Sequence, residues 1–265
     1  MSEEKTSILP DIITPLSDAV QNNIPETAKQ TDGALSTVVG FFNNVVLYPV
    51  KKANLTFKYK LEAFEEDLKE KIKDIPEENI QIPPTMIAGP TLEALRYTYD
   101  EDELREMYEN LLASSMDNRI AIQAHPAFVD AIKQMCPLDA IIFNRILELG
   151  ERLRCAEIIF KLKDTTQVYS KGMPTYFVSE LAELGDPFLV SSILVNIERL
   201  GLVKITESGL LGVDYDDMKK HPYVVERVNL FSQFNREFNI NVKEHAIVVT
   251  NYGEQFAAIC MKKTL

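Results

Sequence analysis

Three histidines are the side chains of this sequence best suited to general-base catalysis or metal binding: His125, His221 and His245. Each stands alone in the sequence, without an HxxxH or HExxH pairing that would place two ligands on one helical face. No GxSxG nucleophile elbow and no GxxxxGK(S/T) phosphate loop accompanies them. Asp117 and Asp130 lie near His125 in the sequence, but carboxylates at turns usually accept backbone hydrogen bonds. The sequence therefore predicts no cofactor and no metal site, and it favours a protein that is not an enzyme.

The cysteines and the charge balance exclude further classes of protein. Cys136, Cys155 and Cys260 are far apart, odd in number and without a CxxC pair, so neither a disulfide framework nor a zinc site is indicated. Forty acidic residues against 28 basic ones give a formal charge of -12, which disfavours binding by neutralisation of phosphates. The N-terminal residues carry no basic start followed by an apolar core, so no secretory signal is predicted. We expect a cytoplasmic protein for which nucleic acid is not a partner.

The elements that would position any site are clearest between residues 82 and 150. After Gly89-Pro90 a helix is predicted to begin at about Thr91. Asp100, with Glu103 three residues later, has the pattern of a capping box for the next helix. That helix places apolar side chains at i, i+3, i+4, i+7 and i+8, which predicts one buried stripe: Leu104, Met107, Tyr108, Leu111 and Leu112. The glutamates off the stripe are expected in water: Glu103, Glu106 and Glu109.

Two further helices are predicted before residue 150. His125-Pro126 opens the first, whose apolar positions include Phe128. Pro137 can serve as the first residue of the second, and Gly150 closes it as a C-cap. Residues 82–150 are thus expected to form a small helical domain.

These residues resemble a known family. The runs AGPTLEALRYTYDEDELREMYENLLASSMD and AHPAFVDAIKQMCPLDAIIFNRIL are similar to the Abi-alpha family, bacterial proteins linked with abortive infection. In that defence a phage-infected cell halts growth or dies. The resemblance covers roughly Ile87 to Leu147, and it departs at Cys136, where a serine is expected before the proline. It implies a role in phage defence, but it assigns no biochemical activity to named residues.

The chain before residue 82 is predicted to have two parts. Residues 1–32, with three scattered prolines, are expected to form a flexible arm. Residues 33–81 are expected to be amphipathic helical segments; their first part, 33–50, is uncharged and followed by Lys51 and Lys52. This first helix could pack on the core or a partner, or lie on a membrane surface through Phe41 and Phe42. Asn43-Asn44 and Pro49 weaken a membrane-spanning interpretation.

Residues 151–265 resemble a winged-helix domain of the MarR-like kind. A strand from Arg154 to Leu162, a helix–turn–helix restarted by Asp186-Pro187, a strand at LVKI and the run HAIVVTNYGEQFAAIC follow in the expected order. The segment from 209 to 243 is longer than an ordinary wing and contains a predicted helix from Val224 to Phe238. The second helix of the pair offers few side chains for phosphates or base edges, so a protein-interaction or packing role is favoured over DNA binding.

The sequence therefore predicts a mainly α fold, α+β overall, with a helical N-terminal and central part and a winged-helix-like C-terminal domain. The favoured function is intracellular phage defence through protein or membrane-surface binding; the alternative is a winged-helix DNA-binding regulator. Arg96, Asp117 and His125 are the candidates for a partner-binding surface. The structural alternatives are an ion pair for Arg96 and helix capping or turn formation for Asp117 and His125. A protein partner from host or phage is expected, peripheral contact with the inner membrane is left open, and so is the oligomeric state.

Overall fold

The structure, a computed structural model, describes residues 55–150, 152–163, 168–169, 172–232 and 237–261, with four single residues before them (33, 36, 37 and 40). The predicted arm 1–32 lies outside the described residues, as do Phe41, Phe42, Lys51 and Lys52. The helices are α3 (Leu55–Ile72), α4 (Thr85–Thr98), α5 (Asp102–Met116), α6 (Ala127–Lys133), α7 (Pro137–Leu149), α8 (Pro187–Arg199), α9 (Pro222–Ser232) and α10 (Asn251–Cys260). Short 3-10 helices are η3 (Glu77–Asn79), η4 (Ala121–Gln123), η5 (Ser179–Leu184) and η6 (Asp216–Lys220). The strands are β1 (Arg152–Leu162), β2 (Val168–Tyr169), β3 (Val203–Thr206) and β4 (Phe238–Val249).

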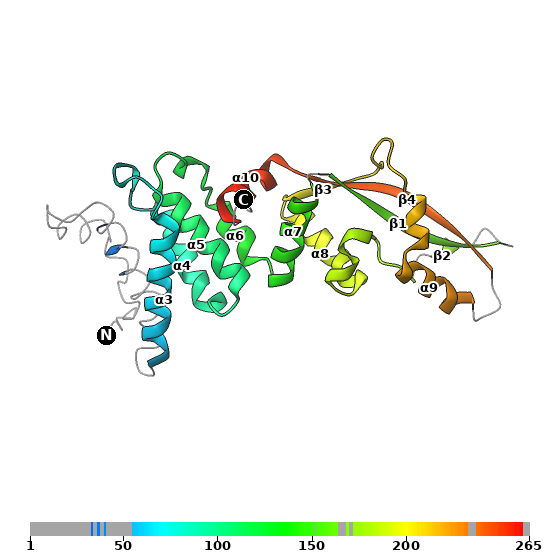
Figure 1. Ribbon diagram of the computed structural model, residues 1–265, viewed down its shortest axis with the longest axis horizontal. Helices are drawn as coiled ribbons and strands as arrows, with labels where there is room; N and C mark the ends of the chain where they lie inside the picture. Colours follow the sequence, from blue (N-terminus) through cyan, green and yellow to red (C-terminus); the bar gives the residue numbers. More distant parts are fainter. Residues whose placement is uncertain are drawn as a thin grey trace, which may run out of the picture.

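The predicted fold class, mainly α with α+β character, is confirmed. Helices α3, α4, α5 and α6 form a body at one end of the molecule (Figure 1). The long strands β1 and β4 extend away from it toward the other end, with α9 beside them, and α7 and α8 lie between (Figure 1). The molecule is therefore elongated, and α10 brings the chain back from the sheet to the helical body.

Helix α5 is the centre of the helical body because its apolar stripe faces several helices at once. The predicted stripe is buried throughout: Leu104, Met107, Tyr108, Leu111 and Leu112. Helices α3, α4, α6, α7 and α10 all pack against α5. Burial of such a stripe contributes roughly 1.5–3 kcal/mol per large apolar side chain, and this packing supplies most of the stability of a helix within a protein.

Two predicted helix starts are wrong. Helix α4 begins at Thr85, six residues before the predicted start, and contains Pro90. A proline inside a helix costs about 3 kcal/mol or more, but Ile87 and Leu92 on either side of it are buried, and their packing offsets that cost. Helix α5 begins at Asp102 after the N-cap Glu101, and no side chain caps it. Asp100 instead pairs with Lys60 of α3 at 2.6 Å.

The sheet has the strand order β2-β1-β4-β3, and each neighbouring pair is antiparallel. β1 and β4 pair along their whole length, from Arg152 opposite Val248 to Leu162 opposite Phe238. The strand predicted from Arg154 is confirmed. The predicted helix from Val224 to Phe238 is wrong at its end, because α9 stops at Ser232 and Phe238 begins β4.

Local capping explains the two C-terminal helices. The Asp186 side chain accepts a hydrogen bond from the backbone N–H of Phe188 at 2.8 Å, and Pro187 is the first residue of α8, as the sequence predicted. Thr250 caps α10 by accepting from the N–H of Gly253 at 2.9 Å. In the predicted helix–turn–helix, the first helix is only the short 3-10 helix η5, and it is followed by α8 and β3. η6 and α9 lie between β3 and β4, so the winged-helix resemblance stays a prediction.

The described residues contain two hydrophobic cores. The larger one runs from Phe64 of α3 to Cys260 of α10 and includes side chains from both sides of residue 150, the predicted domain boundary. The smaller one lies along β1 beside η6 and α9 and includes Phe160, Phe177 and Met218. The first core therefore fixes α5, α7 and α10 relative to one another.

Candidate functional site

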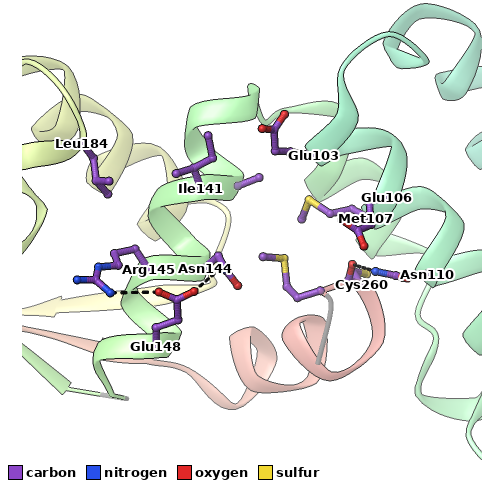
Figure 2. A pocket seen from close by; sticks show the side chains of 12 residues that line it. Glu103, Glu106, Met107, Asn110, Ile141, Asn144, Arg145, Glu148, Leu184 and Cys260 are labelled. Carbon is purple, nitrogen blue, oxygen red and sulfur yellow. Dashed lines mark hydrogen bonds and ion pairs between the residues drawn. The ribbon is translucent and has the colours of Figure 1, made fainter. Parts of the chain in front are cut away.

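A groove of about 400 Å³ lies between α5 and α7 where α10 ends, and we call it the α5–α7 groove. Figure 2 shows glutamates of α5 and side chains of α7 on its two walls, with Leu184 of η5 at one side. Its lining residues are Glu103, Glu106, Met107, Asn110, Ala140, Ile141, Asn144, Arg145, Glu148, Leu184, Cys260 and Met261. The groove combines apolar side chains with several carboxylates, which suits the binding of a segment that carries both kinds of group.

The α5 wall is acidic because of the helical period. Glu103, Glu106 and Asn110 recur at spacings of three and four residues, which places them on one face of the helix. Asn110 is held in place on two sides: its amide donates to the carbonyl of Cys260 at 3.0 Å, and its carbonyl oxygen accepts from Lys71 Nζ at 2.8 Å. The two glutamates are left as the charged groups of this wall.

The α7 wall carries one cation, and acidic groups balance it. Arg145 donates to Glu148 at 3.2 Å and lies 3.8 Å from Glu183. Asn144 donates to the other oxygen of Glu148 at 2.9 Å (Figure 2). Since Arg145 is already paired, the groove as a whole has an excess of negative charge and would repel phosphate groups.

The sulfur at the end of the groove does not suit nucleophilic chemistry. Cys260 is fully buried, and burial raises the pKa of its thiol well above its usual value. A thiol with a raised pKa remains protonated at neutral pH, and the thiolate is the reactive form. Cys260 therefore acts as a packing residue whose backbone carbonyl anchors Asn110.

Asp117, a predicted partner-binding residue, is occupied by a local interaction. Its side chain is 7% exposed and accepts hydrogen bonds from Arg119, from the backbone N–H at 3.0 Å and from the guanidinium at 2.6 to 3.2 Å. The side-chain hydrogen bond from Arg119 is the main reason why the pKa of Asp117 is lowered. Asp117 also forms a β-bridge with Ile80. These contacts fit the structural alternative, a turn-forming residue at the end of α5.

His125 and Arg96 are placed differently. His125 is exposed, and its Nδ1 accepts from the backbone N–H of Ala127 at 3.1 Å, at the start of α6. Arg96 lies within α4, and its side chain is outside the described residues. No hydrogen bond or ion pair among the described residues joins Asp117 to His125, so the contacts do not bring these two candidates together.

The other two histidines also serve local structure. Nδ1 of His221 accepts from the backbone N–H of Tyr223 at 3.3 Å, at the start of α9. His245 is 5% exposed, and its Nδ1 lies 2.7 Å from the carbonyl oxygen of Thr206. Within the described part of the chain, no group of three His, Cys, Asp or Glu side chains is arranged to hold a metal ion.

Helix α8, which would read DNA in a winged helix, exposes apolar side chains instead. Phe188, Leu189 and Val195 are 39 to 50% exposed. Its polar side chains are used internally: Asn196 donates to Asp139 at 2.9 Å, and Arg199 donates to the side chains of Gln134 and Asn196 at 2.8 Å. Groups that could contact bases or phosphates are thereby engaged with the loop before α7.

Two features of α5 and its surroundings were missed by the sequence prediction. Glu109, expected in water, is 3% exposed because α3 covers it, and the charge pattern of α3 gave no signal of this. The part of the α5–α7 groove formed by Cys260 and Met261 was missed as well. The end of α10 is far from α5 in the sequence, and the two pack together only in the folded chain.

Comparison with known proteins decides the family. The abortive infection alpha family model matches residues 56–260, which is most of the chain and runs from α3 to α10. The chain belongs to the abortive infection alpha family. This membership ties it to abortive infection, a defence of bacteria against phage, and it confirms the resemblance seen in the sequence.

Other comparisons are negative. No curated protein and no solved structure matches the chain significantly. The comparisons give no support to a DNA-binding regulator. Among the described residues, no helix combines the length and the apolar character that crossing a membrane requires.

Proposed function

We propose that this abortive infection alpha protein acts in phage defence by binding a protein partner in the α5–α7 groove, rather than by catalysis. The observation that carries the proposal is the groove itself, an acidic and apolar recess of about 400 Å³ within the region that the family model covers. A segment with basic and apolar side chains would complement it in charge and in hydrophobicity.

The state of the titratable side chains supports binding over chemistry. His125 and His221 accept backbone hydrogen bonds at helix starts, and Cys260 is a buried thiol with a raised pKa. A general base must be free to reach a substrate proton, and a nucleophile needs its ionised form. The carboxylates of the groove are the remaining groups to test.

The central experiment is a plaquing assay in a bacterial host that expresses the protein. Ile141 is 38% exposed in the groove, so Ile141→Arg blocks it without disturbing a core. Ile122 is 93% exposed and does not line the groove, so Ile122→Arg is the matched control with the same change in charge. We expect protection by the wild type and by Ile122→Arg, and its loss in Ile141→Arg with an unchanged thermal melt.

Two results would contradict the proposal. Absence of protection by the wild type across a broad phage panel would remove the defence role. Full protection by a folded Ile141→Arg variant would remove the groove as the binding site. Arg96→Ala, Asp117→Ala and His125→Ala belong in the same assay, because these residues were the surface candidates from the sequence.

Amide substitutions separate binding from catalysis. Loss of a catalytic acid or base typically lowers a rate by roughly 100- to 10,000-fold, whereas loss of one carboxylate from a binding surface gives a graded effect. We expect Glu103→Gln and Glu148→Gln each to weaken protection in part. Complete loss in one of them, with normal folding, would favour an enzyme.

Membrane-surface binding depends on residues 33–50 with Lys51 and Lys52, and of these only residues 33, 36, 37 and 40 are among the described residues. Flotation with vesicles that contain anionic lipid tests it directly. Phe42→Asp should abolish flotation if this segment binds lipid.

A further inference from the structure

A second recess lies on another side of α5, where it packs against α3, and we call it the α3–α5 furrow. Its volume is about 280 Å³. Its lining residues are Asp67, Glu70, Lys71, Asp102, Arg105, Glu106 and Glu109. Five of these side chains are acidic and two are basic, so the furrow carries an excess of negative charge.

Glu109 is the buried group of the furrow. Its side chain is 4% exposed, and its Oε1 atom has no hydrogen-bond partner among the described residues. A buried polar atom without a partner costs about 1–3 kcal/mol, and more when it is charged. Natural proteins leave few such atoms, and each requires an explanation.

The two cations of the furrow do not supply the missing hydrogen bond. Lys71 Nζ donates to Asn110 at 2.8 Å and lies 4.0 Å from Glu109 Oε2. Arg105 donates to Asp102 and to the carbonyl of Tyr99, both at 2.8 Å, and its Nε lies 3.7 Å from Glu109 Oε1. Both cations are thus engaged with other acceptors and remain outside hydrogen-bond range of Glu109.

The electrostatic surroundings agree with this geometry. Burial, and after it the nearby Asp67 carboxylate, raise the pKa of Glu109 to about 7. The positive charges of Lys71 and Arg105 act in the opposite direction but do not compensate. The furrow therefore lacks one well-placed positive charge with N–H donors.

We propose that the α3–α5 furrow binds the guanidinium or ammonium group of an organic cation, which donates a hydrogen bond to Glu109 Oε1 and is attracted by Asp67 and Glu106. A guanidinium presents five N–H donors in a fixed plane, so it can serve a buried carboxylate and its neighbours together. A metal ion fits less well, since no three His, Cys, Asp or Glu side chains in the described ranges form a group that could hold one. The site does not depend on the α5–α7 groove, although Glu106 lines both.

The cation could be a free small molecule or an arginine or lysine side chain of another protein. Isothermal titration of the full chain at pH 8 and low ionic strength distinguishes them. One arm uses agmatine, a second uses a pentapeptide with blocked ends and one central arginine, and a third uses calcium chloride. Binding of agmatine identifies a free-cation site, and binding of the peptide without agmatine identifies a protein side chain.

Variants make the test specific to Glu109. We expect Glu109→Gln to weaken binding at least tenfold, and Glu93→Gln, the same charge change at an exposed side chain of α4 that lines neither recess, to leave it unchanged. If Glu109→Gln fails a thermal-melt check, Asp67→Asn replaces it, with an expected weakening of about threefold, because Asp67 is exposed at the furrow. Three results would overturn the proposal. The first is that neither agmatine nor the arginine peptide binds saturably, and the second is that only calcium binds. The third is that Glu109→Gln binds the probes with the same affinity as the wild type.

Discussion

The side-chain amide of Asn110 donates a hydrogen bond to the backbone carbonyl of Cys260 at 3.0 Å, across a sequence separation of 150 positions. Four residues after Asn110, the hydroxyl of Ser114 donates to the carbonyl of Ile259 at 3.1 Å. The last carbonyls of a helix have no partner within the helix, so two side chains of α5 satisfy the C-terminal end of α10. The helical body is therefore completed by the last helix of the described chain.

The first prediction concerns this connection. Asn110→Ala removes the donor to Cys260 and the acceptor of Lys71, and we expect it to lower the free energy of unfolding by about 1–3 kcal/mol. Asn118 follows the C-terminal end of α5 and is exposed, so Asn118→Ala is the control. Its expected change in the free energy of unfolding is within about 0.5 kcal/mol. Urea unfolding measures both. Equal stabilities would mean that the hydrogen bond to Cys260 contributes nothing to the fold.

The second prediction concerns the core around α5. Phe128 is fully buried, and its ring lies edge-on to Tyr252 and Phe256 of α10, with centroids 5.3 and 5.4 Å apart. We expect Phe128→Ala to destabilise by about 3–5 kcal/mol and Leu111→Ala by about 2–5 kcal/mol. Phage protection should fall only as far as the folded fraction falls, and growth at lower temperature should restore it. A variant that is folded but inactive would place the residue in the function itself.

The third prediction concerns the pH dependence of stability. The folded-state pKa of Glu109, raised from 4.5 to about 7, means that the unfolded chain releases this proton first as the pH rises. Glu109 therefore lowers the stability of the protein between about pH 4.5 and pH 7, and the full loss is present above that window. Asp67 and Glu106 strengthen this effect, while Lys71 and Arg105 oppose it.

Glu109→Gln tests the sign. Without a bound cation, we expect it to be more stable than the wild type at pH 8, by up to about 3 kcal/mol, and to differ little at pH 5. Urea unfolding at both pH values measures the difference. Glu148→Gln, a change at a side chain that is 38% exposed, should not alter the pH dependence. A wild type whose stability rises from pH 5 to pH 8 relative to Glu109→Gln would contradict the raised pKa.

The sequence predicted those elements that short-range rules determine. The stripe of α5 follows from a period of 3.6 residues, and the start of α8 follows from an aspartate before a proline. The start of α4 was mispredicted because Pro90 was treated as a stop, and the burial of Ile87 and Leu92 decided otherwise.

The candidate site depended on contacts that sequence rules do not encode. Glu109 lies beside the buried stripe of α5, and it is buried only because α3 docks there. The structural alternative for Asp117 was capping or turn formation, but Arg119, which occupies its carboxylate, was not foreseen as its partner. Pairing between distant segments, such as α5 with α10, cannot be read from local periodicity.

The last prediction concerns Gly253, in the first turn of α10. Helix propensity alone predicts that Gly253→Ala would stabilise the protein, by roughly 0.5–1 kcal/mol. The packing predicts the opposite, because a Cβ atom at this position would lie 2.0 Å from the carbonyl oxygen of Leu202. That oxygen belongs to the backbone and accepts from the N–H of Thr250 at 3.1 Å, so it cannot move aside without loss of this bond.

We therefore expect the steric conflict at Gly253 to exceed the gain in propensity. Gly253→Ala should destabilise by about 1–3 kcal/mol, the usual cost of overpacking, measured by thermal and urea unfolding. Gly185 has no atom within 4 Å of an added Cβ and an extended backbone, so Gly185→Ala is the matched control and should be tolerated. A stabilised Gly253→Ala variant would show that α10 can move away from Leu202. Such a shift would also disturb the Asn110–Cys260 hydrogen bond at the other end of α10. In that case, a double-mutant cycle should show that Asn110→Ala lowers the free energy of unfolding less in the Gly253→Ala background than in the wild type.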